Sequence, residues 1–106
     1  MRSSDRDDIE RDFDTLRALV SRILGRSFAA LTTPDRLTYL QRLEHETRRL
    51  QVPAHELLNQ LAEQATRDDL GGELTDAVAD RLHITRGDAR RRVAEAADLG
   101  PRRAHR

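Results

Sequence analysis

The chain has 106 residues, of which 37% are hydrophobic, 36% are charged and only 3% are aromatic. A chain of this length forms one domain, and so few aromatics mean that its core must be built from Leu, Ala, Val and Ile. We expect residues 1–106 to be a single domain whose thin core is supported by a second copy or by another domain. No cysteine is present, which excludes disulfides and thiolate metal sites and indicates a reducing, cytoplasmic location. Neither a signal peptide nor a membrane span is expected, because residues 1–12 are charged and the longest apolar runs are only a few residues.

The net charge is zero, but it is distributed unevenly along the chain. Residues 1–80 contain eleven arginines against sixteen acids, a net charge of −5, whereas residues 81–106 contain eight arginines against three acids, a net charge of +5. This asymmetry is typical of a basic binding face at the C-terminal end, and it is equally typical of a basic tail without a partner.

The first predicted helix runs from about Asp5 to Leu24 and carries one regular apolar stripe. Its apolar residues recur at spacings of four, three, four and three: Ile9, Phe13, Leu16, Val20 and Ile23. Acidic residues suit the positive N-terminal end of a helix, and Gly25 suits its C-terminal end. The stripe fits packing within the domain, and it also fits a short coiled-coil seam.

A second helix is predicted to start with Thr33 as its N-cap and Pro34 at its first position. Its inward face consists of leucines: Leu37, Leu40, Leu43 and Leu50. Pro53 predicts a kink or a break near Gln51, because proline lacks the N–H donor and clashes with the preceding turn. A further helix and a loop follow, over residues 54–65 and 68–72. These segments together form the predicted helical platform, residues 5–70.

Residues 73–99 carry the pattern of two short helices joined by a tight turn. The apolar faces are formed by Leu74, Ala77, Val78 and Leu82 in the first helix and by Ala89, Val93 and Ala96 in the second. Small Ala79 is expected where the helices approach closely, and Leu82 and Ile84 are expected to point into the shared core. The turn contains His83 where glycine is usual, and histidine is among the residues that tolerate a positive φ. These features predict a helix-turn-helix.

The ends of the second helix of this pair have clear signals. Thr85 is a good N-cap, and Asp88 three residues later completes a pattern like a capping box. The helix is expected to run to about Leu99 and to end at Gly100-Pro101, because proline cannot continue it.

The sequence VADRLHITRGDARRRVAEA resembles the helix-turn-helix of sigma-factor-like proteins. In such a motif the second helix enters the major groove and its N-terminal residues contact base edges. The predicted DNA-binding residues lie at the start of that helix and in the basic tail, residues 100–106: Thr85, Arg86, Arg90, Arg91, Arg102 and Arg103, with Arg106 as a further phosphate contact. The alternative is an αα-hairpin with a solvated arginine face. Double-stranded DNA is the predicted nucleic acid, because the chain lacks the aromatic residues that bind single strands.

No catalytic site is expected. The run His55-Glu56-Leu57-Leu58-Asn59 differs from the zinc-protease motif HExxH by one residue, and the Asn59 amide is a poor zinc ligand. The chain has no glycine-rich phosphate loop and no Ser, His and acid arrangement. We therefore predict a non-enzymatic protein without a metal or a cofactor.

Three segments carry a family resemblance: LTTPDRLTYLQRLE, LLNQLAEQA and LGGELTDAVADRLHITRGDARRRVAEAADLGPRRA. They resemble the N-terminal region of the 13E12-repeat family, over about Arg11 to Ala104. The resemblance implies a relative of actinobacterial, mobile-element-associated proteins whose long members join a helical domain to an HNH endonuclease-like domain. The HNH motif is absent from this chain, so the resemblance implies a truncated member with no nuclease residue.

The sequence as a whole predicts an all-α protein of about five helices, with a helical platform followed by a helix-turn-helix. The predicted function is a non-catalytic DNA-binding module. The alternative is a helical protein-interaction or dimerisation module, or an inert remnant, that does not bind DNA.

Overall fold

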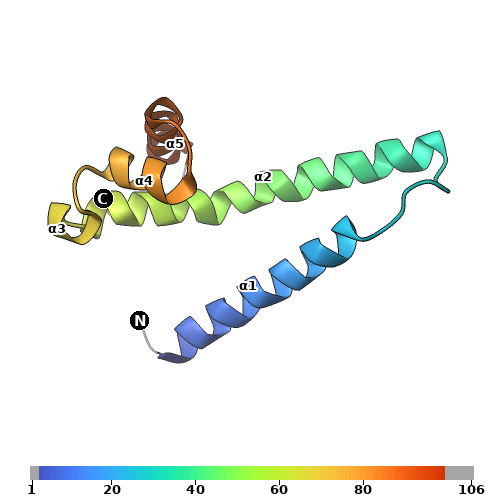
Figure 1. Ribbon diagram of the computed structural model, residues 1–106, viewed down its shortest axis with the longest axis horizontal. Helices are drawn as coiled ribbons and strands as arrows, with labels where there is room; N and C mark the ends of the chain where they lie inside the picture. Colours follow the sequence, from blue (N-terminus) through green and yellow to red (C-terminus); the bar gives the residue numbers. More distant parts are fainter. Residues whose placement is uncertain (1–2, 100–106) are drawn as a thin grey trace. The chain divides into compact units, whose positions relative to one another are not determined.

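The computed structural model describes residues 3–99, which contain helices and no strand (Figure 1). The helices are α1 (Ser3–Leu24), α2 (Thr33–Gln64), α3 (Arg67–Leu70), α4 (Leu74–Leu82) and α5 (Arg86–Leu99). The predicted all-α class is confirmed, and in this range no helix is long and apolar enough to cross a membrane. The chain divides into two compact units, Met1–Tyr39 and Leu40–Arg106, so the boundary between them falls inside α2.

Helix α1 ends at Leu24 as predicted and begins two residues earlier than predicted, and its apolar stripe is largely exposed. It begins at Ser3 and ends at Leu24, after which the Gly25 N–H donates to the Ser21 carbonyl at 3.1 Å. Leu16 is half-buried, whereas the other stripe residues are between 44% and 56% exposed: Ile9, Phe13, Val20 and Ile23. The stripe of α1 is therefore an apolar surface in this structure.

The start of α2 differs by one residue from the prediction. Thr32, not Thr33, is the N-cap: its hydroxyl accepts from the Asp35 N–H at 3.2 Å, and the Asp35 carboxylate accepts from the Thr32 N–H at 3.3 Å. This reciprocal pair is a capping box with the shorter acid. Pro34 consequently occupies the second helical position, where a missing N–H costs nothing because the first-turn N–H groups have no partner inside the helix.

The predicted break near Gln51 is wrong, since α2 continues through Pro53 to Gln64. Proline leaves the carbonyl four residues earlier, that of Arg49, without its helical donor. Arg49 and Pro53 are both exposed, so water can hydrogen-bond this carbonyl and the helix does not have to end. The cost of the proline is local, and the sequence on either side of it remains helical.

The predicted loop at Asp68 to Gly72 is also wrong in part, because Arg67–Leu70 forms the one-turn helix α3. Thr66 and Asp69 form a complete capping box at its start, and the hydrogen bonds from Thr66 lower the pKa of the Asp69 carboxyl. Gly71 closes the turn in the left-handed region at φ 73°, and Arg67 pairs with Glu73. The segment predicted as a loop therefore contains one helical turn, which Thr66 caps at its start and Gly71 ends.

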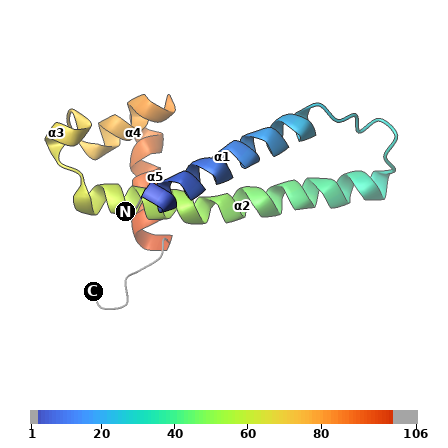
Figure 2. The same cartoon turned by 90° about the horizontal axis from the view of Figure 1, so that it is seen from below.

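The core of the second unit is small and is formed mainly between α4 and α5. Val78, Ala79 and Ala89 are buried together, and half-buried Leu58, Leu74 and Ile84 pack against them. Helix α5 runs crosswise to α4 and to the C-terminal half of α2 (Figures 1 and 2). No large side chain among the described residues is fully buried, so the thin core expected from the composition is observed.

Asn59 ties α5 to α2. Its Nδ2 donates to the Ala96 carbonyl at 2.8 Å in a half-buried position, and Ala96 itself has no exposed surface. Asn59 lies where the zinc motif would have its second histidine, and its amide has a structural partner instead.

We predict that Asn59→Ala lowers the free energy of unfolding by about 1 kcal/mol, the usual net value of an intramolecular hydrogen bond. Urea denaturation followed by circular dichroism measures this change. Gln60→Ala is the matched control, because Gln60 bonds only to exposed Glu56 on its own helix. Equal effects of the two substitutions would contradict the assigned role.

Candidate nucleic-acid interface

The turn between α4 and α5 has the predicted left-handed geometry. His83 adopts φ 57° and ψ 46° and is the only residue other than glycine with a positive φ among those described. The His83 N–H donates to the Ala79 carbonyl, and the Ile84 N–H donates to the same carbonyl at 3.0 Å. The Ile84 side chain also packs onto the α4–α5 core, as in a Schellman motif, where a hydrophobic contact accompanies the hydrogen bond.

Small side chains bring the two helices together. Ala79 of α4 is 6% exposed, and Ala89 of α5 is fully buried, as predicted. Val93 is half-buried, whereas Leu82 is 49% exposed and does not enter the shared core. The prediction for Leu82 is wrong because the left-handed turn starts directly after it, which directs the chain inward at Ile84 instead.

Thr85 caps α5. Its hydroxyl accepts from the Asp88 N–H at 3.0 Å, and its carbonyl accepts from the Ala89 N–H at 2.9 Å. The Asp88 carboxylate does not complete the box within the described residues; it pairs with Arg91 at 3.3 Å. The Thr85 hydroxyl is therefore committed to the helix end and is a positioning group in this structure.

Two of the predicted DNA-binding arginines contact acids of their own unit. Arg86 Nε lies 3.2 Å from Asp76 Oδ1 on α4, and its side chain is 76% exposed. Arg91 pairs with Glu95 at 3.1 Å and with Asp88, and its side chain is 58% exposed. The hydrogen bond to Glu95, and to a smaller extent the one to Asp88, raise the pKa of the Arg91 guanidinium.

Arg90 differs from these two arginines. It is exposed and makes no ion pair or hydrogen bond with any other side chain among residues 3–99. Other predicted features lie outside the described residues: the stop at Gly100-Pro101 and the basic tail with Arg102, Arg103 and Arg106. Within the described range, the candidate surface thus contains one unpaired and two paired guanidinium groups.

The electrostatics of this surface are mixed. Helix α5 contains four arginines and three acids, so the helix itself is only slightly basic. The helix N-terminus contributes a partial positive charge and unpaired N–H groups near Arg86. The arrangement suits contact with a phosphate backbone at the start of α5.

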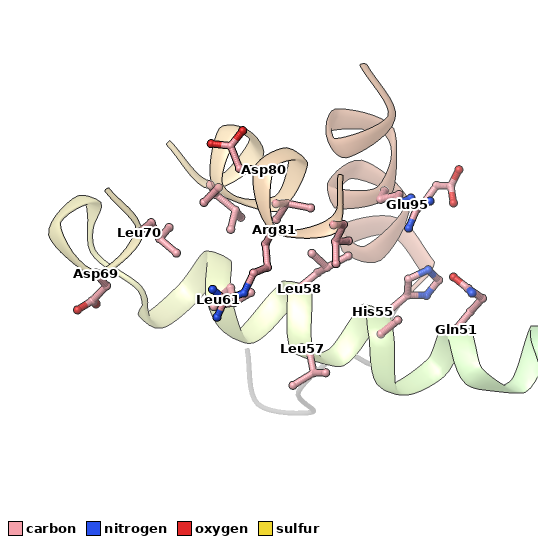
Figure 3. A pocket seen from close by; sticks show the side chains of 16 residues that line it. Gln51, His55, Leu57, Leu58, Leu61, Asp69, Leu70, Asp80, Arg81 and Glu95 are labelled. Atoms are coloured by element: carbon pink, nitrogen blue, oxygen red, sulfur yellow. The ribbon is translucent and has the colours of Figure 1, made fainter. Parts of the chain in front are cut away.

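A groove of about 740 Å³ lies elsewhere on the same unit, between α2, α3, α4 and α5 (Figure 3). Leu58 and Leu61 of α2 and Leu74 and Val78 of α4 are among its apolar lining residues. Arg81 extends from α4 toward α2, and exposed Leu82 belongs to the lining.

One histidine and several charged side chains line the groove together with its apolar residues. His55 lines it, but no group of three or more His, Cys, Asp or Glu side chains that could hold a metal ion occurs in residues 3–99.

The prediction from sequence overlooked two partners in this unit. Asp76 anchors Arg86 across the helix pair, and Asn59 anchors α5 to α2. The only signal for Asp76 was an acid ten residues before an arginine in a predicted helix pair, which is too common to single out.

Comparison with known proteins gives one family and a group of mycobacterial relatives. The family described as Domain of unknown function (DUF222) matches residues 37–105. Uncharacterized protein Rv1128c of Mycobacterium tuberculosis is 52% identical over 95% of this chain and 22% of its own length. Uncharacterized protein Mb1179c of Mycobacterium bovis is 54% identical over 98% of this chain and 23% of its own length.

A shorter relative, Uncharacterized protein Rv3466 of M. tuberculosis, is 53% identical over 98% of this chain and 47% of its own length. The chain thus spans between about a quarter and a half of these relatives. No solved structure matches it.

We predict that His83→Gly raises the free energy of unfolding by up to about 1 kcal/mol. A side chain in the left-handed region costs roughly 1–2 kcal/mol, and part of this gain is offset by the greater freedom of glycine in the unfolded chain. Urea denaturation measures the change, with His83→Ala as the control, because alanine keeps the Cβ that causes the strain. Stabilisation by alanine as large as that by glycine would contradict the explanation.

Proposed function

The chain belongs to the DUF222 family, and we propose that it is a non-catalytic DNA-binding module that contacts duplex DNA with the start of α5. The observation that carries the proposal is the Thr85-capped end of α5, set by the left-handed turn at His83, with Arg86 and Arg90 exposed beside it. In helix-turn-helix proteins the corresponding end of the second helix enters the major groove.

The chemistry of this end suits DNA. The first-turn N–H groups and the helix dipole favour an anion such as phosphate, and a guanidinium binds phosphate or guanine through two parallel hydrogen bonds. Arg90, which has no ion-pair partner in the described range, supplies the first contact. We propose Arg86 and Arg91, and Arg102 and Arg103 of the tail, as further contacts.

The ion pairs on α5 weaken this surface but do not block it. The side chains of Arg86 and Arg91 are more than half exposed, and ion pairs between exposed side chains contribute little to stability. A phosphate group can accept two parallel hydrogen bonds from one guanidinium, whereas Asp76 holds Arg86 through a single Nε–Oδ1 contact at 3.2 Å. Arg86 can therefore exchange its contact with Asp76 for a contact with phosphate at little cost in free energy.

The resemblance to the 13E12-repeat family supports a place for this module in a longer protein. In that proposal, DNA contact by the helical module would bring an HNH endonuclease-like domain, located elsewhere in the longer protein, to its substrate. The module works in the cytoplasm and performs no catalysis itself. Its contribution is affinity for duplex DNA.

We predict that the chain binds a mixed-sequence duplex with an affinity that falls steeply with salt, because each neutralised phosphate releases counterions. The double variant Arg86→Ala and Arg90→Ala should lose binding at least about tenfold and lower the salt slope by about 2. Fluorescence anisotropy of a labelled duplex, measured over a series of salt concentrations, gives both quantities.

The matched control is Arg48→Ala with Arg49→Ala, which removes the same charge from the exposed face of α2. This control should retain the wild-type affinity and slope. Absence of binding by the wild-type chain at micromolar concentration and low salt, or equal losses in both double variants, would reject the proposal.

Protein interaction is the second candidate function, and the α1 surface favours it. Phe13 on the stripe and Leu24 beside it are 56% and 80% exposed, on a helix that is otherwise highly charged. Contiguous apolar surface of this kind marks contact sites for other proteins.

A further inference from the structure

The turn between α4 and α5 holds an exposed histidine in a backbone conformation that favours glycine. His83 adopts φ 57° and ψ 46°, and its side chain is exposed. A side chain in the left-handed region costs free energy, and a residue that is kept there in spite of the cost points to a function. The His83 ring forms no hydrogen bond or ion pair with any residue in the range 3–99. No polar contact within this range therefore offsets the cost.

The end of α3 shows the same backbone geometry made with glycine. Gly71 has φ 73° and ψ 19°, and its N–H donates to the Arg67 carbonyl, just as the His83 N–H donates to the Ala79 carbonyl. In both turns the N–H of the next residue donates to the same carbonyl at 3.0 Å. Glycine at position 83 would preserve this cap. The turn geometry therefore does not explain why position 83 carries an imidazole.

His83 lies beside the proposed DNA-binding end of α5. Thr85 caps this helix two residues later, and Arg86 is its first residue. The three residues from His83 to Arg86 span at most about 11 Å, whereas phosphates follow one another along a DNA strand at an axial spacing of about 3.4 Å. Both side chains can therefore reach one stretch of the same strand. All three residues belong to the unit Leu40–Arg106, so their mutual arrangement is internal to that unit.

The charges next to the turn are compatible with a phosphate. Within three residues of His83 the chain has two arginines, Arg81 and Arg86, and one acid, Asp80. Arg86 shares its charge with Asp76, whereas Arg81 makes no ion pair in the described range. An imidazole donates a hydrogen bond through a ring N–H even when it is neutral, and a phosphate oxygen is a strong acceptor. A contact between the His83 ring and phosphate consequently needs no change in protonation.

We infer that His83 is a further DNA contact, in which a ring N–H donates to a phosphate oxygen of the strand that Arg86 contacts. This inference rests on the proposed DNA-binding function and names a residue that the sequence pattern did not include in the site. A phosphate contact positions a protein on the duplex without reading its sequence. His83 should therefore strengthen binding to all duplexes by the same factor.

Measurement of stability and affinity on the same variant of the whole chain tests the inference. His83→Gly should raise the free energy of unfolding, as predicted above. It should at the same time weaken binding of a mixed-sequence duplex about fivefold, as expected for one lost hydrogen bond. A residue that acted only through the turn would not separate the two effects, because a more stable turn would bind at least as tightly. Urea denaturation and fluorescence anisotropy measure the two quantities.

Two further variants separate the ring from the backbone. Asparagine tolerates the left-handed region and carries an N–H donor, so His83→Asn should bind more tightly than His83→Gly. His45→Ala removes a histidine ring from an exposed position on α2 and should bind like the wild type. Equal affinities of the two His83 variants, or a loss in His45→Ala as large as that in His83→Gly, would overturn the inference.

Nuclear magnetic resonance tests the contact directly. The chain has four histidines, and single substitutions assign their ring C–H signals. Addition of the duplex to the wild-type chain should shift the His83 signals and leave the His45 signals in place. A purely structural role of His83 predicts no such difference between the two rings.

The outcomes separate this inference from the proposed function. Absence of duplex binding by the wild-type chain would overturn both. A wild-type chain that binds duplex no more tightly than His83→Gly, or whose His83 ring signals do not shift, would overturn the His83 contact alone and leave DNA binding in place.

Discussion

The close contact of α4 with α5 at Ala79 and Ala89 is the constraint on which the rest of the second unit depends. Both side chains are small enough to let the helix backbones approach, and a larger residue at Ala89, which has no exposed surface, would have to displace its neighbours. The contact requires the chain to turn sharply within three residues, which it does through the left-handed His83. Ile84 then fills the space beside the two alanines. The orientation of the α5 N-terminus, and with it the candidate DNA surface, follows from this contact.

A core built from alanines has a consequence for the rest of the molecule. Alanine burial removes little apolar area from water, and buried apolar area is the main favourable term in folding. The larger apolar residues of the chain lie mostly on surfaces, such as Phe13 on α1 and Leu82 at the groove. A protein with this distribution gains stability from anything that covers those surfaces. The thin core and the exposed apolar surfaces are therefore two aspects of one composition.

Charge on α5 is organised by the same helix pair. Asp76 and Arg86 come from different helices, and their ion pair depends on how the turn sets α5 against α4. Arg91 is held along its own helix by Asp88 and Glu95, at the three- and four-residue spacings that bring helical side chains together. Of the arginines predicted to bind DNA and described here, only Arg90 is left to solvent. The arginines of this candidate surface thus differ in their partners: Arg90 has no ion pair in the described range, whereas Arg86 and Arg91 are held by acids.

The amino-acid sequence by itself determined the features that depend on nearby residues: the helical class, the end of α1 at Leu24, the left-handed turn at His83 and the cap at Thr85. Prediction from neighbouring residues failed at two helix starts. Thr32 and Thr33 could both act as the N-cap of α2, and Thr32 does so; residues 67–70, predicted as part of a loop, form a helical turn that begins with a capping box. Tertiary structure alone decided the continuation of α2 through Pro53, the exposure of Leu82, and the partners Asn59–Ala96 and Arg86–Asp76. The physical reason is range: capping and turn geometry are set within four residues, whereas burial and ion pairing depend on which segments meet in space.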